Sequence, residues 1–305
     1  MKKEFYGHGK LMLTGEYTVL DGATSLALRT RVGQRLIVTP SPDMEKALLW
    51  DSIDHSGNEW FWGVFSPAGD VMSATDMATS ARLSSFLKVC IEKNPEFNIA
   101  GFTARVESEF DLSWGLGSSS SLIYTLARWA EVDPYDVLDG AFTGSGYDIA
   151  AAHPSRYNGL LYNRIDGNPQ WEDVDFKPSY ADDIYFVYSG QKQNSRDGIK
   201  AYRTLSSDKR RAVIPAIDEI GRKMLKAGSL SAFEECIDEH EKIMSSLIEI
   251  ESIKTQKFQD FTTGSVKSLG AWGGDFYMAT GKDAPEYFKS KGYDVIIPFA
   301  SLIEK

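Results

Sequence analysis

This chain has few of the residues that build disulfide frameworks or transition-metal sites. Its 305 residues include only two cysteines and four histidines. Neither a Cys-x-x-Cys nor a His-Glu-x-x-His pattern is present, so a structural or catalytic zinc ion is not expected. Cys90 and Cys236 lie among apolar neighbours in helix-like stretches. We therefore expect two buried thiols and no disulfide framework.

Long apolar runs and an excess of positive charge are also missing. No run approaches the ~20 apolar residues that span a bilayer, and residues 1–7 do not lead into a secretory core. We therefore expect a cytoplasmic protein with no membrane partner. The net charge of −10 argues against a nucleic-acid partner, because most of the surface would repel a phosphate backbone. Any phosphate site must be locally positive.

The residues that are present point to phosphate binding, above all in the first glycine loop, residues 111–121 (Asp-Leu-Ser-Trp-Gly-Leu-Gly-Ser-Ser-Ser-Ser). Gly115 and Gly117 permit positive φ and a close approach of the backbone to an anion. The serines offer hydroxyls and free amides at the first turn of a helix. The loop matches neither a Walker loop nor a dinucleotide fingerprint. A plain helix start capped by Ser118 remains an alternative.

The rest of the chain reads as an α+β pattern that restarts near residue 155. Residues 9–22 read as a strand, a tight turn and a second strand, and the second glycine loop, residues 267–275, precedes a strand-like stretch at 276–279. Apolar periodicity predicts helices at residues 80–93, 118–131, 207–226 and 231–250. Alternation predicts strands at 102–109, 159–164 and 183–189. The length favours two lobes, which we expect at 1–154 and 155–305.

These segments, together with Gly144-Ser145-Gly146-Tyr147-Asp148, resemble the GHMP kinases in type and in order. The family is named for galactokinase, homoserine kinase, mevalonate kinase and phosphomevalonate kinase. The resemblance covers residues 5–280 and is strongest to the mevalonate and phosphomevalonate kinase branch. It implies a two-lobed fold: an N-terminal, nucleotide-binding mixed-sheet lobe of the ribosomal protein S5-like type, and a C-terminal ferredoxin-like α/β sandwich lobe that contributes to the acceptor site.

The resemblance also implies an ATP- and Mg²⁺-dependent kinase that acts on a small molecule, as a monomer or homodimer. Asp148 would accept the proton of the attacking hydroxyl, and Lys10 would steer that carboxylate and offset charge. A helix cap and a solvated strand-end charge are the simpler alternatives for these two residues. Ser119 would bind Mg²⁺, with Ser118 as a possible substitute. The triphosphate would be held by Gly115, Leu116, Gly117, Ser118, Ser119 and Ser120.

Two departures from the family pattern stand out. Mevalonate kinases carry a second metal-binding glutamate eleven residues before the aspartate, where this chain has Val137. The carboxylates that could replace it are Asp136, Asp139 and Glu16. Trp272 and Asp275 stand where the family usually has glycine or a small residue. Trp272 could pack over the adenosine side or plug the lobe interface, and we favour the second.

The acceptor is the least determined feature. Lys192, Ser195 and Arg196 follow the strand at 183–189, where related kinases hold the acceptor, and with Lys200 they could grip a carboxylate or phosphate or simply be solvated. In the second glycine loop, Gly270, Ala271 and Gly273 are also expected to line the acceptor site. An aspartate base favours the alcohol of mevalonate, whereas the opening motif, Gly9 to Leu20, favours phosphomevalonate. Phosphorylation of a sugar or amino-acid alcohol, decarboxylation of diphosphomevalonate and an inactive nucleotide-binding homologue remain alternatives.

Overall fold

The computed structural model describes residues 1–141, 144–191, 195–270, 272 and 274–303, and only the backbone of residues 195–197. The chain forms two compact units. The first comprises residues 1–9, 32–112 and 116–154, and the second comprises residues 10–31, 113–115 and 155–305. Residues 10–31 and 113–115 thus group with the second unit, whereas the boundary expected at 154/155 would assign them to the first.

The first unit contains a mixed sheet. Its strands lie in the order β5 (Val71–Ala74), β4 (Glu59–Phe65), β3 (Leu48–Ile53), β6 (Phe102–Ser108) and the later part of β2 (Ser25–Pro40). β3 and β6 are parallel, and the other pairs in this order are antiparallel. β1 (Lys3–Met12) also pairs with β2. The side chains of Ala104, Val106 and Ser108 alternate into the core, as the period of two in a half-buried strand requires.

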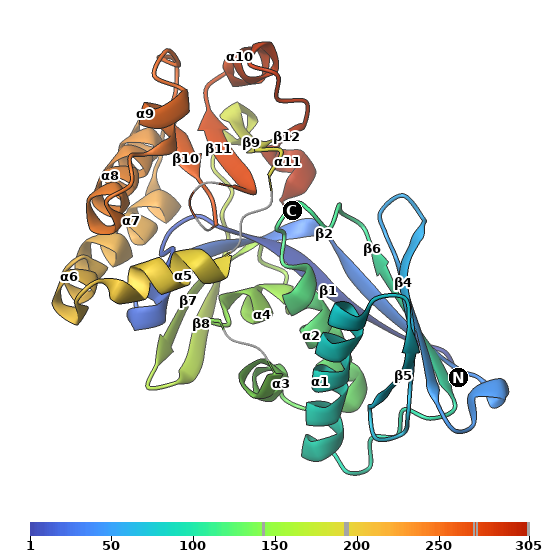
Figure 1. Ribbon diagram of the computed structural model, residues 1–305. Helices are drawn as coiled ribbons and strands as arrows, with labels where there is room; N and C mark the ends of the chain where they lie inside the picture. The colour runs from blue at the N-terminus through green and yellow to red at the C-terminus, as the bar shows by residue number, and fades with distance from the viewer. Residues whose placement is uncertain (142–143, 192–194, 271, 273, 304–305) are drawn as a thin grey trace. The chain divides into compact units, whose positions relative to one another are not determined.

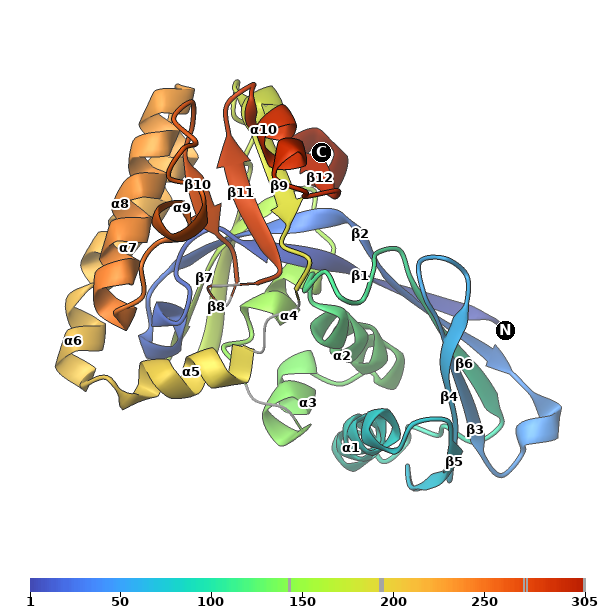
Figure 2. The same ribbon diagram turned by 45° about the horizontal axis from the view of Figure 1, so that its top comes forward.

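The unit also contains helices α1 (Met77–Lys93), α2 (Ser118–Ala130), α3 (Pro134–Ala141) and α4 (Tyr147–Ala152), which pack on one another, and α1 packs against β4 and β5 (Figure 2). A short 3-10 helix, η2, spans Pro42–Met44. The side chain of Asp76 caps α1 by accepting from the Thr79 amide. The same helix ends at Lys93, as the Asn94-Pro95 pair predicts. The buried face of α1 consists of Ser80, Leu83, Ser84, Phe86, Leu87 and Cys90.

The second unit contains the hairpin β7 (Gly159–Ile165) and β8 (Asn168–Val174), which pairs through β7 with the beginning of β2. It also contains a separate four-stranded antiparallel sheet. The order of that sheet is β10 (Val266–Ser268), β11 (Phe276–Thr280), β9 (Ile184–Tyr188) and β12 (Ile296–Pro298). The predicted α+β class, with a mixed sheet, is confirmed.

Helices α7 (Ile214–Lys226) and α8 (Leu230–Ile248) lie side by side, and α8 packs against β10 (Figures 1 and 2). Ile217, Ile220 and Met224 of α7 are buried, as are Phe233 and Met244 of α8, so the predicted apolar stripes face the core. The unit also contains α5 (Ser195–Thr204), α6 (Ser207–Ala212), α9 (Ile253–Lys257), α10 (Ala284–Ser290), α11 (Phe299–Leu302) and the 3-10 helix η3 (Ala181–Asp183).

Two predicted elements are wrong in detail. The second strand expected before residue 22 is instead a 3-10 helix, η1 (Thr18–Asp21), because Tyr17 at φ 59° and Gly22 at φ 95° turn the chain at both ends. The helix expected over residues 207–226 is divided into α6 and α7. Pro215 lies in the first turn of α7 and lacks the amide that a continuous helix would require.

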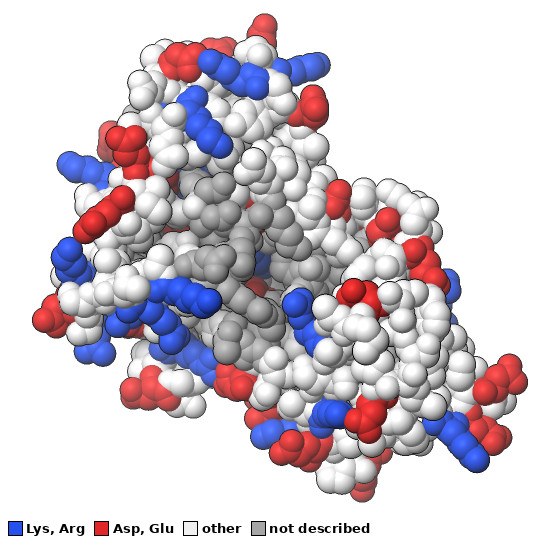
Figure 3. Space-filling model, viewed as in Figure 1, with Lys and Arg blue, Asp and Glu red and all other residues white. Residues whose placement is uncertain are grey.

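The expectation of two thiols is confirmed: both cysteines are free and buried. Burial raises the pKa of the Cys90 thiol to about 12. Among the described residues, no helix is both long and apolar enough to span a bilayer. Acidic and basic side chains are interspersed over the face that Figure 3 presents.

Candidate functional site

The first glycine loop passes directly into α2. Gly117, at φ 89°, is the N-cap residue of this helix, and no side chain caps it. The alternative in which Ser118 caps the helix is therefore wrong. The amides of Ser120 and Ser121 both donate to the Gly117 carbonyl over 3.0 Å. The amides of Ser118 and Ser119 precede them at a positively polarised helix start, where a ligand's phosphate would be favoured.

Asp148 lies in the same unit as this helix start. Gly146, at φ 85°, is the N-cap of α4, and Asp148 follows in its first turn without capping it. The Tyr135 hydroxyl donates to the Gly146 carbonyl over 3.1 Å and so holds the turn. Ser120 Oγ, on a buried side chain, donates to Asp148 Oδ2 over 2.5 Å. The structure therefore brings the predicted carboxylate to the predicted phosphate-binding helix.

Lys10 belongs to the second unit, where it contacts the beginning of the first glycine loop. Its Nζ donates to the Gly115 carbonyl over 3.0 Å. The alternative of a merely solvated strand-end charge is therefore not supported. Asp275 approaches the same glycine. A β-carbon added to Gly115 would overlap the Asp275 carboxylate as it is placed, and the left-handed φ of 67° also favours glycine here.

Glu16 is the centre of a buried charge cluster in the second unit. Its side chain is 2% exposed, and its Oε1 accepts from Lys267 Nζ over 2.6 Å. Lys267 Nζ also donates to Glu241 Oε1 over 3.2 Å. His240 Nε2 lies 3.1 Å from Glu16 Oε2 without a hydrogen bond between them. Two carboxylates and one ammonium thus meet away from solvent.

Burial and charge pairing shift the pKa values in this cluster in opposite directions. Burial acts to raise the pKa of Glu16, but Lys267 and His240 outweigh it and hold that pKa below its usual 4.5. Burial acts to lower the pKa of Lys267, but Glu16 and Glu241 outweigh it and hold that pKa above its usual 10.5. Both groups are therefore charged at neutral pH.

The proposed metal ligands fit unequally. Glu16 does not fit, because its buried carboxylate already pairs with Lys267, and Mg²⁺ usually keeps several of its waters. Asp136 pairs with Lys93 over 3.1 Å, and Asp139 is exposed. Among the described residues, no group of three or more His, Cys, Asp or Glu side chains could hold a metal. Ser119, half-buried in the first turn of α2, fits a single oxygen ligand beside nucleotide phosphates.

The second glycine loop is described only in part. Trp272 packs within the second unit against an apolar cluster that includes Tyr202, Ile217 and Met244. Of the predicted acceptor residues, Gly270 is described and has φ 75°. Lys192, Ala271 and Gly273 lie outside the described residues, as do the side chains of Ser195 and Arg196.

Sequence reasoning missed the buried group of Lys267, Glu241 and His240. No local pattern links Glu16 to Lys267, which are 251 residues apart. The one available signal was the position of Lys267 as the first residue of the second glycine loop. Sequence reasoning also missed the contact between Ser120 and Asp148, because Ser120 was assigned to the nucleotide alone.

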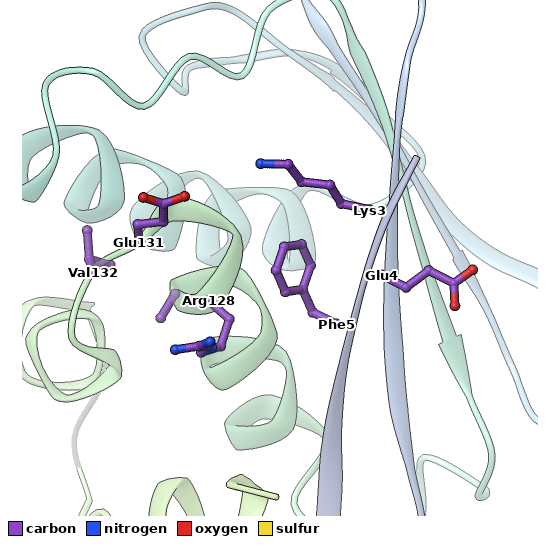
Figure 4. Close-up of a pocket in the computed structure, with 7 residues that line it drawn as sticks. Lys3, Glu4, Phe5, Arg128, Glu131 and Val132 are labelled. Atoms are coloured by element: carbon purple, nitrogen blue, oxygen red, sulfur yellow. The ribbon is translucent and has the colours of Figure 1, made fainter. Parts of the chain in front are cut away.

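Two grooves in the described part of the chain lie away from these residues. One of about 700 Å³ lies between the start of β1 and the end of α2, lined by Lys3, Glu4, Phe5, Ala127, Arg128, Glu131 and Val132. In Figure 4, Glu4 points away from Lys3 on the other side of the strand. A second groove of about 460 Å³ lies between the end of α7 and the beginning of α8. Neither is lined by a predicted site residue, so neither is assigned a role.

Neither the protein-family models nor the sequences of curated proteins match this chain. The solved structures that are similar to it include three kinases. Mevalonate kinase of Methanococcus jannaschii matches with TM-score 0.69 and 14% identity over 100% of this chain and 98% of that one. Galactokinase of Lactococcus lactis, complexed with galactose, matches with TM-score 0.71 and 13% identity over 99% and 93%.

Phosphomevalonate kinase of Streptococcus pneumoniae, in complex with phosphomevalonate and AMPPNP, matches with TM-score 0.64 and 15% identity over 99% of this chain and 97% of that one. Identities this low establish the fold and not the activity. The predicted fold is confirmed by these likenesses.

Proposed function

We propose that this chain, which has the GHMP kinase fold, is an ATP- and Mg²⁺-dependent kinase for a small metabolite, with mevalonate or phosphomevalonate as the favoured acceptor. The observation that carries the proposal is the 2.5 Å hydrogen bond from Ser120 Oγ to Asp148 Oδ2. Phosphoryl transfer needs a phosphate-binding element and a group that orients the acceptor. This bond joins a residue of each kind.

In the proposed mechanism, residues 115–120 hold the triphosphate through backbone amides and serine hydroxyls. Ser120 engages Asp148 Oδ2, so Asp148 Oδ1 is the oxygen that accepts the proton of the attacking hydroxyl. Lys10, held at the Gly115 carbonyl, offsets negative charge at the loop. When bound at Ser119, Mg²⁺ would neutralise charge on the phosphates.

Three observations bear on the choice of acceptor, and the third of them favours mevalonate over phosphomevalonate. The mevalonate kinase and the phosphomevalonate kinase cover nearly the whole chain. The opening motif, Gly9 to Leu20, and the segment around Asp148 resemble the same branch. Asp148 itself favours an alcohol acceptor, which requires a base, over a phosphomonoester that is already largely ionised at neutral pH.

A second candidate function is nucleotide binding without catalysis. One observation favours it: Val137, which is buried, stands where mevalonate kinases carry their second metal-binding glutamate. A nucleotide-binding homologue that has lost turnover could tolerate the loss of this ligand.

The experiment that tests the proposal incubates the protein with Mg-ATP and, separately, mevalonate, phosphomevalonate, homoserine and galactose, and measures ADP release. Isothermal titration calorimetry measures ATP binding in parallel. ADP formation with mevalonate or phosphomevalonate supports the proposal. ATP binding with no turnover on any acceptor favours the second candidate, and absence of both contradicts the two together.

A further inference from the structure

Asp275 is held in place by the backbone on both sides. It lies at the end of the second glycine loop, directly before β11, with φ 55° in the left-handed region. Its amide donates to the Gln191 carbonyl over 2.9 Å, and its carbonyl accepts from the Ser189 amide over 2.7 Å. Both partners follow β9. The direction in which this side chain leaves the backbone is therefore set by the end of the four-stranded sheet.

The Asp275 carboxylate points at the first glycine loop. A β-carbon added to Gly115 would lie 2.3 Å from Asp275 Cγ, 2.4 Å from Oδ2 and 2.6 Å from Oδ1. A β-carbon added to Gly270 would lie 3.4 Å from Oδ2. Both glycines have positive φ, at 67° and 75°. The carboxylate thus occupies the space that the missing side chain of Gly115 opens.

This space is suited to an anion. Glycine permits close approach of the backbone, and the ammonium of Lys10 lies at the carbonyl of the same residue. A carboxylate and a phosphate each place anionic oxygens on such a loop, and they repel each other strongly where solvent is partly excluded. Residues 113–115 are half-buried, so screening by water is incomplete.

We propose that Asp275 sets both the affinity and the metal dependence of nucleotide binding, because its carboxylate occupies the anion position at Gly115. This inference rests on the proposed function, since it presumes that a nucleotide's phosphates bind the first glycine loop. A metal-free triphosphate must displace or oppose the carboxylate. A divalent cation bound to the triphosphate would neutralise much of the triphosphate's negative charge, so the Asp275 carboxylate would repel the complex less.

A structural role for the same side chain makes a different prediction. If Asp275 only ties the loops together, Asp275→Asn, which keeps the shape of the side chain and the backbone hydrogen bonds, would leave nucleotide affinity unchanged. If its charge opposes the nucleotide, Asp275→Asn and Asp275→Gly both tighten binding of metal-free ATP. The two substitutions separate charge from shape, because only the second also removes the side chain and relieves the left-handed backbone.

The test is calorimetric titration of the wild type, Asp275→Asn and Asp275→Gly with ATP, once with excess EDTA and once with Mg²⁺. We expect the Kd for metal-free ATP to fall at least about tenfold in both variants. We expect the ratio of Kd without Mg²⁺ to Kd with Mg²⁺ to shrink. Both effects should weaken at high salt, which screens charge.

The matched controls are Asp166→Asn and Asp166→Gly. Asp166 is also a left-handed aspartate, at φ 50°, in the same unit, but it is exposed in the turn between β7 and β8. These variants remove the same charge from the same backbone conformation, and we expect no change in either Kd. Circular dichroism melting of every variant shows whether it is folded.

The outcomes separate this inference from the proposed function. If the wild type binds Mg-ATP and Asp275→Asn binds metal-free ATP no more tightly, the inference is overturned and the proposed function stands. If only the Asp275 variants bind metal-free ATP, the inference is supported. If no folded protein binds ATP even with Mg²⁺, the proposed function fails and the inference falls with it.

Discussion

At the scale of single residues, two polar contacts have opposite characters. The contact between Ser120 and Asp148 involves a half-buried carboxylate at the start of two helices, so it can meet a ligand. The contact between Glu16 and Lys267 is wholly buried and pairs two charges. The two contacts have similar lengths but differ in burial. The first is accessible to a ligand, whereas the second joins the opening motif to β10.

Asp148→Asn should remove most of the turnover and leave nucleotide binding intact. Loss of a general base costs about 10²–10⁴-fold in rate, and the amide keeps the shape of the side chain. The measurements are kcat by coupled ADP assay and the ATP Kd by calorimetry. Asp43→Asn is the matched control, because Asp43 is an exposed aspartate of the same unit and has no role in the candidate site. Full turnover in Asp148→Asn would exclude this aspartate from the mechanism.

Lys267→Met should destabilise the protein far more than Lys291→Met. Each lysine lies 2.6 Å from a carboxylate, but Lys267 is 0% exposed, whereas Lys291 and its partner Asp260 are 38% and 60% exposed. Removing Lys267 leaves buried carboxylates unpaired, which costs about 3–5 kcal/mol. Removing the exposed lysine should cost less than about 1 kcal/mol. Urea denaturation measures both, and equal losses would contradict the burial of the cluster.

At the scale of elements, the turn after β1 positions the opening motif. Gly15 has φ 91°, and its backbone packs against Ser25 at the beginning of β2. Tyr17 follows at φ 59°, and η1 begins at the next residue. These backbone conformations direct the Glu16 side chain into the core of the second unit, where it accepts a hydrogen bond from Lys267. The element therefore depends on a residue without a side chain.

Gly15→Ala should be more destabilising than Gly167→Ala. Both glycines have positive φ, at 91° and 81°, so both substitutions incur about 1–2 kcal/mol of left-handed strain. A β-carbon at Gly15 would in addition lie 2.7 Å from Ser25 Cβ and 2.8 Å from Ser25 Cα, whereas nothing lies within 4 Å at Gly167. Chemical denaturation of the two variants gives the comparison. A smaller loss for Gly15→Ala would mean that the turn differs from the one described.

At the scale of the whole molecule, stability and ligand binding are linked. The chain has a net charge of −10 and buries ionised groups. Its unfolding free energy should therefore depend on pH through the buried cluster and on nucleotide through binding to the folded state alone.

Acid should destabilise the protein through Glu16. Its folded pKa is lowered below 4.5, so its contribution is present above pH 4.5 and is lost as pH falls through the folded value. The folded pKa of Lys267 is raised above 10.5, so its contribution is present below pH 10.5 and is lost at higher pH. Denaturation curves recorded at a series of pH values from 7 to 3 give the unfolding free energy at each pH. This free energy should fall more steeply with decreasing pH for the wild type than for Glu16→Gln. Identical slopes would contradict the pairing.

Mg-ATP should raise the melting temperature of the wild type and of Asp148→Asn alike. A ligand at a hundred times its Kd adds about 2.7 kcal/mol to the stability of a folded state that alone binds it. Differential scanning fluorimetry with a nucleotide series measures the shift, and AMP at the same concentration controls for the triphosphate. No shift with Mg-ATP for either protein would contradict nucleotide binding.

Much of the architecture follows from local sequence signals. The periodicity of α1 and α8 and the Asn94-Pro95 stop act over a few residues, so they predict those helices closely. The glycine loops and Asp148 identified a phosphate-binding candidate, because close backbone approach and helix starts have short signatures. The signals failed where a single proline or left-handed residue redirected the chain, as between α6 and α7 and at η1.

Only the tertiary structure revealed which charges meet. Periodicity and motif spacing describe one segment at a time, whereas the surroundings of Glu16 depend on a lysine 251 residues away. The same holds for Asp275, whose charge matters because folding brings it to Gly115. Burial and long-range contact decide the electrostatics of a carboxylate, and both arise only when distant segments pack together.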